Sequence, residues 1–537
     1  MNVSGLSSRR IAVACGTFAM LGMLSFLQAS EPAKQDSWAE PHRVAAIIDE
    51  EIAKAWDAAG VVPAGPADDA EFLRRISLDL IGRIPNVMSA RDYLEQDDPG
   101  KCEALIDSLL SDSRFIVHFT NMWSNALLPP SDGNLNNQIY VPSFEVWLRQ
   151  SLLTEVSYRD LVLQILDSSA AQGGAYQSVN DSSPAAFFAT RENKPENLAA
   201  ATSRLFLGVR IECAQCHDHP FDSWTQKDFW GFAAFFANES ARRDARPSFL
   251  SSMRSVFGVS NGIRIPDTNE FVRPTFLDGT SLEGSASAKR ALATWITDKD
   301  NPYFSRMAVN RIWAHFFGIG LVDPVDDFSD LNPPSHPELL DLLAREFREH
   351  DYDMKFLIRA IVSSKTYQLS SVQTHESQSY PQRFGKQALK GLTADQVVAN
   401  LTEATGGFKS FTTNPPIFSI GPEARIRELF QNSDGNAVDQ PTTILQSLSL
   451  MNGELVVSAT DVQNSRTLAA VLDFPGFDRE QQLETLFLAA LTRFPTEEER
   501  ERFLTYIDQR ETDESSTQAL ADIFWVLLNS SEFLYNH

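Results

Sequence analysis

The stretch PENLAAATSRLFLGVRIECAQCH, residues 195–217, joins a helical pattern to a motif of two cysteines and a histidine. Pro195 and Glu196 suit the first turn of a helix, because proline has no N–H to leave unbonded there and an acid favours the positive end of the helix dipole. The apolar residues that follow at helical spacings are Leu198, Ala201, Leu205 and Phe206. The stretch therefore predicts a helix that leads into the motif, with the two thiols and the imidazole on one helical face.

Helical periodicity extends over most of the remaining sequence. Residues 42–58 place Val44, Ile48 and Ile52 on one face, and such an apolar stripe is typical of an amphipathic helix. Further helices are expected over 103–110, 144–166, 289–298, 303–317, 336–349, 354–368, 393–405, 442–451, 480–492, 497–509 and 517–531. Residue pairs that suit helix caps are Asn301 with Pro302, Ser335 with Glu338, Thr496 with Glu499, and Thr225 with Asp228.

Residues 238–288 interrupt this rhythm with glycines, prolines and serines, which favour loops. We expect an irregular connection here, with a short strand pair near Ile263–Ile265 and Phe271–Phe276. The expected fold class is therefore mainly α: two helical domains joined by an irregular Pro/Gly/Ser-rich connection with little β.

Length and composition exclude several classes of protein. The 537 residues exceed the usual size of one domain, so we expect two or three. A hydrophobic fraction of 43% and a charged fraction of 22% exclude a largely disordered chain and a membrane bundle. The formal net charge is −25, and so acidic a surface repels the phosphates of nucleic acids. We expect no nucleic-acid partner.

The first thirty residues have the composition of a secretory signal peptide. Arg9 and Arg10 precede an apolar run over 11–27, and a polar stretch follows. We expect residues 1–30 to be removed on export, which places the protein in the periplasm or at the cell surface. A retained anchor is the alternative, since the run approaches the length of a membrane span. No later segment is long and apolar enough, so we expect no membrane span after signal cleavage.

Cys213, Cys216 and His217 form the CxxCH signature of c-type haem attachment. In that chemistry two thiols add across the vinyl groups of haem, and the adjacent imidazole binds the iron. Cys15 leaves with the signal, and an odd number of remaining cysteines in an exported protein favours joint use of the close pair. We predict haem c as the cofactor, bound by Cys213 and Cys216, with His217 as the metal ligand and Cys102 as a buried thiol.

Two other uses of the cysteine pair stay open. Cys213 and Cys216 could form a local disulfide, structural or redox-active, with His217 lowering the pKa of a thiol. They could also bind zinc with His217 or His219 and a distant fourth ligand, although the sequence has no second pair at zinc-like spacing. The aromatic residues over 221–236 could wall a porphyrin, but such stripes are more often plain core.

A second axial ligand for a haem iron must come from outside the motif, because His219 is too close to His217 to reach the opposite face. The candidates are His118, His315, His336 or a methionine. For His315, within the helical stretch 303–317, we favour an interface hydrogen bond.

Four aspartates follow that stretch, namely Asp323, Asp326, Asp327 and Asp330. They could hold calcium, although turn and capping roles are commoner and EF-hand spacing is absent. The region formed by His315, Asp326, Asp327 and His336 suggests a further hypothesis, an enzyme that acts on surface polysaccharide. No nucleophile elbow, HExxH motif, phosphate-binding glycine loop or dinucleotide fingerprint occurs, so no known hydrolase or nucleotide chemistry is visible.

Five long segments carry a family resemblance: RRISLDLIGRIP (74–85), PAAFFATRENKPENLAAATSRLFLGVRIECAQCHDHPFDSWTQKDFWGFAAFF (184–236), NPYFSRMAVNRIWAHFFGIGLVDPVDDF (301–328), SHPELLDLLAREF (335–347) and LLNSSEFLYNH (527–537). They resemble the planctomycete-type exported proteins built from two paired domains of unknown function, a cytochrome c-associated family. The division that the resemblance implies is a first domain over 31–240 with the CxxCH segment, a linker over 241–285 and a second domain over 286–537.

Many relatives in that family carry a separate cytochrome c-like domain ahead of the pair, and this sequence lacks it. Cys213, Cys216 and His217 are therefore the haem candidate that remains. Further residues match the family pattern without an implied role, namely Arg311, His315, Asp326, Asp327 and His336.

These expectations combine into one functional hypothesis and its alternative. We predict an extracytoplasmic c-type haem-binding protein that transfers electrons or uses haem in an oxidation, with an unidentified redox or cell-surface protein as partner. The alternative is a non-catalytic cell-surface binding or scaffold protein in which Cys213 and Cys216 form a structural disulfide.

Overall fold

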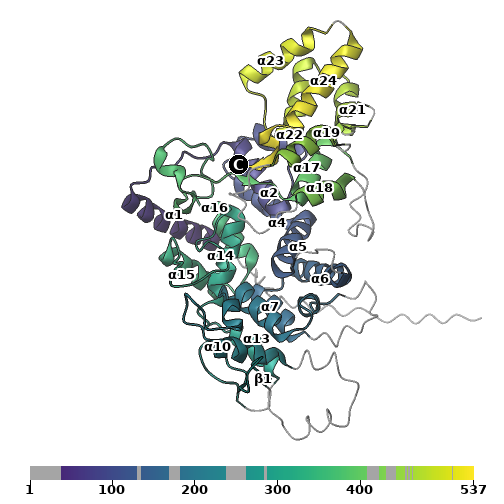
Figure 1. Ribbon diagram of the computed structural model, residues 1–537. Coiled ribbons are helices and arrows are strands. Elements are labelled where there is room, and N and C mark those ends of the chain that lie inside the picture. Colours follow the sequence, from purple (N-terminus) through teal and green to yellow (C-terminus); the bar gives the residue numbers. More distant parts are fainter. Residues whose placement is uncertain are drawn as a thin grey trace, which may run out of the picture. The chain divides into compact units, whose positions relative to one another are not determined.

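The computed structural model describes residues 38–129, 135–168, 182–237, 262–283, 287–407, 422–430, 443–453, 456–457, 460–462, 464–510 and 512–537. Within these ranges the fold is mainly helical with two small two-stranded sheets, which confirms the predicted fold class (Figure 1). The predicted signal peptide and most of the predicted linker lie outside the described residues. The domain boundaries at 240 and 285 stay predictions.

The helices account for most of the described chain. They are α1 (Ala39–Ala59), α2 (Asp69–Ile81), α3 (Val87–Glu95), α4 (Lys101–Ser111), α5 (Ser113–Leu127), α6 (Leu135–Leu153), α7 (Tyr158–Asp167), α8 (Ala186–Ala189), α9 (Pro195–Thr202), α10 (Gln226–Ala233), α13 (Ala288–Ile296), α14 (Phe304–Phe317), α15 (Pro337–Glu349), α16 (Met354–Ser363), α17 (Ala394–Thr405), α18 (Pro422–Phe430), α19 (Ile444–Asn452), α21 (Arg466–Asp473), α22 (Arg479–Leu491), α23 (Glu497–Asp508), α24 (Asp513–Leu528) and α25 (Ser531–Leu534).

Shorter elements connect them. The π-helix η2 (Ser203–Leu207) follows α9, and the 3-10 turns are η3 (Glu212–Gln215), η4 (Ala234–Phe236), η5 (Glu376–Ser379) and η6 (Pro381–Arg383). The antiparallel strand pairs are β1 (Ile263–Arg264) with β2 (Phe271–Val272), and β3 (Lys390–Gly391) with β4 (Tyr535–Asn536). The first pair confirms the strand pair predicted in the connection.

Helix starts follow the cap chemistry that the sequence predicts at most of the marked positions. Thr496 and Glu499 form the capping box of α23, and Thr225 and Asp228 form that of α10. Each box satisfies two backbone N–H groups that the first turn of a helix leaves unbonded. Local sequence therefore fixes where these helices begin.

The cap predicted from Ser335 with Glu338 is wrong. Ser335 turns away from the helix and donates its hydroxyl to the carbonyl oxygen of Leu321 at 3.1 Å. His336 precedes α15 without a side-chain cap, and Pro337 occupies the first helical position, where no N–H needs an acceptor.

Two predicted helices are interrupted. The helix expected over 144–166 is wrong in its continuity, because Glu155 adopts a left-handed φ of 54° between α6 and α7. The helix expected from Pro195 into the motif is also wrong in its extent: it passes into η2 and ends at Gly208, whose φ is 72°. A Cβ at Gly208 would lie 2.4 Å from a ring carbon of Phe328, so only glycine fits.

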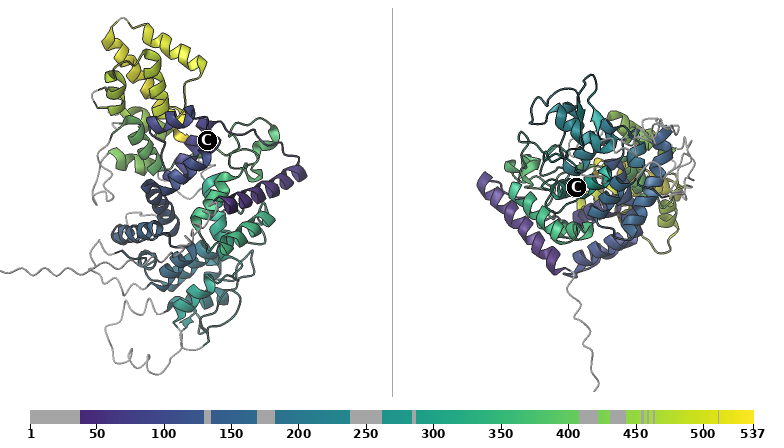
Figure 2. Two further views of the ribbon diagram at one scale, coloured as in Figure 1. Left: turned by 180° about the vertical axis from the view of Figure 1, so that it is seen from behind. Right: turned by 90° about the horizontal axis from the view of Figure 1, so that it is seen from below.

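The helices pack into a core that joins segments far apart in the sequence. α14 packs against α15, α16 and η2, and α2 packs against α5. Leu78 and Ile84 belong to the same buried apolar cluster as residues of α17, α22 and α24. α1 lies beside α15 (Figure 2), where Arg43 Nη2 and Glu346 Oε2 are 2.5 Å apart. Among the helices of the described ranges, none is long and apolar enough to cross a membrane.

Candidate functional site

In the CxxCH segment, Cys213 lies on η3, Cys216 caps this turn, and His217 follows it. Side chains three residues apart eclipse one another in a 3-10 helix, so Cys213 and Cys216 leave the turn on the same side. Both cysteines are exposed, whereas Ala214 between them is fully buried. The turn thus presents two neighbouring thiols to solvent while its own backbone stays anchored.

His217 follows the turn and is exposed. Its Nδ1 lies 2.7 Å from the carbonyl oxygen of Asp218, which can only accept, so Nδ1 carries the proton. In the neutral ring Nε2 then holds a free lone pair. A hydrogen bond from the other ring nitrogen to a carbonyl is the usual support of a metal-binding histidine, because it fixes the tautomer and the ring orientation.

His219 has the opposite hydrogen-bond role. Its Nδ1 accepts the backbone N–H of Phe221 at 3.2 Å, so in the neutral ring the proton sits on Nε2 and neither nitrogen keeps a free lone pair. Of the two histidines near the cysteines, His217 is therefore the one prepared to bind a metal.

The motif is held in place by side chains from the start of α10. Gln226 Nε2 donates to the carbonyl of Cys216 at 2.9 Å, and Trp230 Nε1 donates to that of Gln215 at 3.0 Å. The backbone N–H of Gln226 also donates to Asp218 Oδ1 at 2.8 Å. The capping box of α10 orients these groups, so the sequence from 213 to 230 acts as one unit.

The aromatic residues after the motif divide into two groups. Those buried in the core are Phe229, Trp230, Phe232, Phe235 and Phe236. Phe221, in contrast, is 77% exposed, and Trp224 is half-buried. The expectation that most of this stripe is core is confirmed, and the aromatic side chains of the stretch that reach the surface are Phe221 and Trp224.

The donor set fits covalent attachment of haem c. Two exposed thiols on one side of a turn and an imidazole with a free Nε2 are the groups that attachment requires. The apolar macrocycle also needs an apolar surface to cover, and the exposed Phe221 lies four residues after His217 in the sequence. Cys213, Cys216 and His217 are therefore the residues that would hold the group.

The structure also bears on the other two uses of the cysteine pair, a disulfide and a zinc site. Cys213 and Cys216 are both free thiols in the structure. Within the described ranges, no three His, Cys, Asp or Glu side chains are grouped so that they could hold a metal ion. Cys102, expected as a buried thiol, is only half-buried, with its Sγ 3.4 Å from the hydroxyl of Tyr93.

The candidate second axial ligands face other partners. The rings of His118 and His315 lie 5.5 Å apart, and His315 Nε2 donates to the carbonyl of Asp79 at 2.8 Å. The expected interface hydrogen bond of His315 is thus present. His336 Nδ1 lies 3.0 Å from the hydroxyl of Ser335.

The residues suggested for polysaccharide chemistry do not contact one another in the contacts that the structure describes. Asp326 Oδ1 accepts from Arg210 at 2.6 Å, His315 faces Asp79, and the ring of His336 packs on Phe384 at 5.3 Å. These side chains therefore point to three separate environments rather than to one reacting centre.

The structure contains a buried polar network around Asp79 that the sequence does not predict. Asp79 Oδ1 accepts from Lys390 Nζ at 2.5 Å and from Asn536 Nδ2 at 2.7 Å, and Oδ2 accepts from the hydroxyl of Tyr367 at 2.8 Å. Burial lowers the pKa of Lys390 and raises that of Tyr367. The partners lie up to 457 residues apart, so no local pattern predicts the network.

His118 is part of the same buried region. Its Nε2 is buried without a hydrogen-bond partner, and burial, together with the charges of His315 and Lys390, lowers its pKa to about 3. His118 is therefore neutral at ordinary pH, which suits packing between helices.

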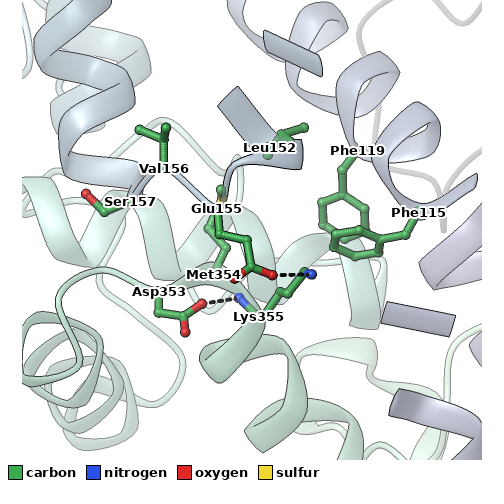
Figure 3. Close-up of a pocket in the computed structure, with 9 residues that line it drawn as sticks. All are labelled: Phe115, Phe119, Leu152, Glu155, Val156, Ser157, Asp353, Met354 and Lys355. Atoms are coloured by element: carbon green, nitrogen blue, oxygen red, sulfur yellow. Dashed lines mark hydrogen bonds and ion pairs between the residues drawn. The ribbon is translucent and has the colours of Figure 1, made fainter. Parts of the chain in front are cut away.

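A separate surface pocket lies at the start of α16 (Figure 3). Its lining residues are Phe115, Phe119, Leu152, Glu155, Val156, Ser157, Asp353, Met354 and Lys355. Lys355 Nζ bonds Glu155 Oε1 at 2.7 Å across it. The lining holds neither cysteine nor histidine, and it shares no residue with the CxxCH segment.

Two family matches cover separate parts of the chain. Residues 47–241 match PSCyt2, described as a protein of unknown function (DUF1549), and residues 288–438 match PSD1, described as a protein of unknown function (DUF1553). The first match contains η3 and Asp79, and the second contains α14 and Lys390. No curated protein and no solved structure matches the chain.

Proposed function

Because this chain belongs to the proteins that pair the PSCyt2 and PSD1 domains, both of unknown function, we propose a function from the site itself. The protein is an exported haem c protein that binds haem covalently through Cys213 and Cys216, binds its iron through His217, and exchanges electrons with a redox partner. This proposal includes the export that the sequence before residue 31 suggests.

The arrangement of the three donors carries the proposal. Both thiols are exposed on one side of η3, and the hydrogen bond from His217 to the Asp218 carbonyl leaves Nε2 free. A haem-attachment apparatus must reach both thiols from solvent, and a firmly anchored turn keeps them at a fixed spacing.

The residues around the motif have defined roles in this proposal. Haem, when bound, supplies a one-electron couple. The Asp218 carbonyl orients the imidazole of His217 and increases its basicity. Gln226 and Trp230 hold the carbonyls of the turn, which keeps the donors in place. The exposed position brings the site within reach of a partner protein.

The first test is the visible spectrum of the chain made in cells that attach haem c. We expect a c-type alpha band, covalent haem in the intact mass, and loss of both in Cys213→Ser with Cys216→Ser. His217→Ala is expected to keep the covalent haem but to change the spectrum, because the iron loses a ligand. Cys102→Ser is the matched control and should leave colour and mass shift unchanged.

Two results would contradict the proposal. A colourless protein without covalent haem, made alongside a c-type cytochrome that does mature, excludes attachment. An intact mass lower by two hydrogens, restored on reduction and absent in the double serine variant, would instead support the alternative of a binding or scaffold protein with a local disulfide.

A further inference from the structure

Arg311 on α14 is a cation with buried N–H groups that lack acceptors. Its Nε and Nη2 are both buried without a hydrogen-bond partner, although the side chain as a whole is partly exposed. Burial lowers its pKa. A buried donor without an acceptor is costly, and more so when it is charged, so such groups usually mark a bound water or ligand.

η2 brings a second arginine to the same place. Gly208 at the end of η2 faces Met307 of α14, since a Cβ there would lie 3.1 Å from the sulfur. Arg204 belongs to η2 and Arg311 to α14, and these two elements pack against each other. In agreement, the charge of Arg204 lowers the pKa of Arg311.

The charge of a third arginine, Arg191, interacts with that of Arg204. Arg191 is buried and donates to the carbonyls of Phe187 and Leu127 at 2.9 and 2.7 Å, with its guanidinium 4.0 Å from the Phe187 ring. Burial and the charge of Arg204 lower the pKa of Arg191 to about 9. Both of these hydrogen bonds go to neutral carbonyls, which do not balance the charge of the guanidinium.

The nearby carboxylate of Asp326 lies closer to Arg210 than to Arg204. Asp326 Oδ1 accepts from Arg210 Nη2 at 2.6 Å, whereas its Oδ2 lies 3.6 Å from Arg204 Nε. The charges of Asp326, Asp327 and Glu212 all raise the pKa of Arg210. Of these three acids, only Asp326 also raises the pKa of Arg311, as does the phenol of Tyr158.

The arginine cluster, Arg191, Arg204 and Arg311, therefore carries more positive charge than its surroundings balance. Arg204 and Arg311 share the charge of one carboxylate, Asp326, whose shortest bond goes to Arg210, and Arg191 bonds neutral carbonyls. The chain as a whole is strongly acidic, with a net charge of −25, so this excess is local. Guanidinium groups offer paired N–H donors that match the oxygens of phosphate and sulfate.

We propose that the arginine cluster is a binding site for a doubly charged tetrahedral oxyanion, a phosphate or sulfate group, which accepts from Arg311 and Arg204 while Arg191 adds to the local positive charge. The group is either a free inorganic ion or an ester on a larger molecule. The proposal is independent of haem, because neither α14 nor η2 contains a residue of the CxxCH segment.

Calorimetric titration of the full chain tests this site. Sodium sulfate, sodium phosphate, phenyl phosphate and sodium acetate are titrated separately at constant ionic strength, with chloride as the background anion. We expect saturable binding of one dianion per chain, and binding of acetate at least about tenfold weaker, since it can form fewer charge-assisted hydrogen bonds. Equal affinity for phenyl phosphate assigns the site to an ester, and loss of affinity assigns it to a free ion.

Variants on the two elements locate the binding. Arg311→Met and Arg204→Gln should each raise the dissociation constant of the dianion about tenfold or more. Arg306→Gln is the matched control, because Arg306 lies on the same helix and pairs with Asp341. It should bind as the unchanged chain does. If Arg311→Met does not fold, Arg204→Gln carries the comparison, since its side chain is 44% exposed.

The outcomes separate clearly. Heat that rises linearly without saturation, or binding that survives in both Arg311→Met and Arg204→Gln, would overturn the proposal. The unfolding temperature of the variant without added anion is a second measurement. Arg311→Met should unfold at a temperature no lower than that of the unchanged chain, because it removes a buried charge whose Nε and Nη2 lack acceptors. A clearly lower temperature would show that Arg311 is already satisfied without an anion.

Discussion

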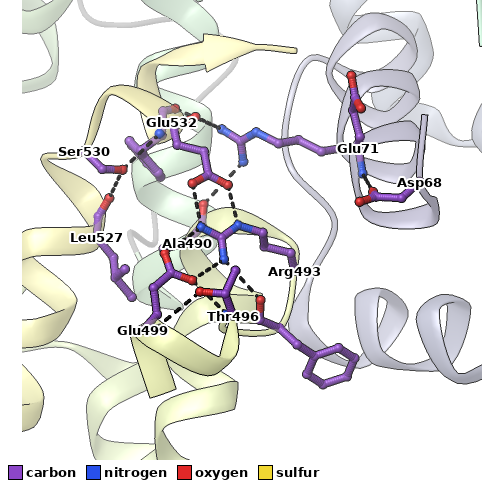
Figure 4. A network of polar contacts seen from close by, with 12 residues as sticks. Asp68, Glu71, Ala490, Arg493, Thr496, Glu499, Leu527, Ser530 and Glu532 are labelled. Atoms are coloured by element: carbon purple, nitrogen blue, oxygen red, sulfur yellow. Dashed lines mark hydrogen bonds and ion pairs between the residues drawn. The ribbon is translucent and has the colours of Figure 1, made fainter. Parts of the chain in front are cut away.

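Arg493 joins two acidic side chains, Glu499 and Glu532. Its Nη1 and Nη2 bond Glu499 at 2.7 and 2.9 Å, and its Nε and Nη2 bond Glu532 at 2.6 and 2.8 Å (Figure 4). The hydrogen bonds from Arg493 lower the pKa of Glu499 to about 2, although partial burial opposes them. A lowered carboxyl pKa means that the ionised form stabilises the fold.

We expect Glu499→Gln to reduce the unfolding free energy at pH 7 by about 1 kcal/mol, after allowance for solvent screening. The difference from the unchanged chain should persist above pH 4.5, the ordinary pKa, and vanish as the pH falls toward 2, because protonation removes the same charge. Glutamine can still accept the N–H of Thr496, so the cap survives. Urea unfolding at several pH values measures the effect.

The neighbouring Glu498→Gln is the control. Its pair with Arg502 has side chains that are 82% and 69% exposed, so its loss should leave the unfolding free energy nearly unchanged. A pH-independent difference for Glu499→Gln would show that its charge is not the cause.

At the residue scale, the sequence predicts chemistry only where the partners are close in the chain. Cys213, Cys216 and His217 are visible as a spacing, and so is the capping box of Thr496 with Glu499. The free Nε2 of His217 is not visible, because it depends on which carbonyl the ring meets. The pair of Asp79 and Lys390 is equally hidden, since 311 residues separate them.

At the scale of elements, periodicity predicts helices well and their interruptions poorly. The stripe over 42–58 gives α1, and the pattern after Thr496 gives α23. Periodicity does not predict α2 or α5. α2 is buried nearly all round, and a helix of that kind lacks a polar face. The break at Glu155 is not predictable from the sequence, because a left-handed φ at a glutamate has no sequence signature.

Gly208→Ala tests the junction of η2 with α14. We expect a loss of about 2 to 4 kcal/mol in unfolding free energy, from the left-handed φ of 72° and from a Cβ forced against Phe328. Gly60→Ala is the matched control, with a φ of 63° but open space around the Cβ, and should cost about 1 to 2 kcal/mol. Chemical denaturation compares the two. Equal losses would mean that the contact with Phe328 yields at no cost.

At the scale of the whole molecule, residues 40–537 form one compact unit, although the family matches divide the sequence into two segments. α2 supplies much of the connection. Arg74 Nη2 donates to the carbonyls of Glu532 and Phe533 at 3.0 Å each, and Asp79 bonds Lys390 and Asn536. A resemblance that predicts two domains does not show how closely they interlock.

Asp79→Asn should therefore weaken the entire unit. Lys390 would remain buried, at 7% exposure, without its counter-charge, and we expect a loss of about 3 to 5 kcal/mol. Unfolding followed by circular dichroism and by tryptophan fluorescence should give one coincident transition, shifted as a whole in the variant. The half-exposed pair of Asp341 with Arg306 supplies the control, Asp341→Asn, with a loss of about 1 kcal/mol or less. Two separate transitions, of which only one shifts, would contradict a single cooperative unit.

The bonds between α2 and residues 532–537 also set an order of events during synthesis. Glu532 and Phe533 are added to the growing chain 458 and 459 residues after Arg74, and Asn536 follows 457 residues after Asp79. Until then the buried guanidinium of Arg74 has none of these acceptors. A ribosome-bound chain can form its helices early, but the native packing of α2 must wait until the last segment of this sequence has been made.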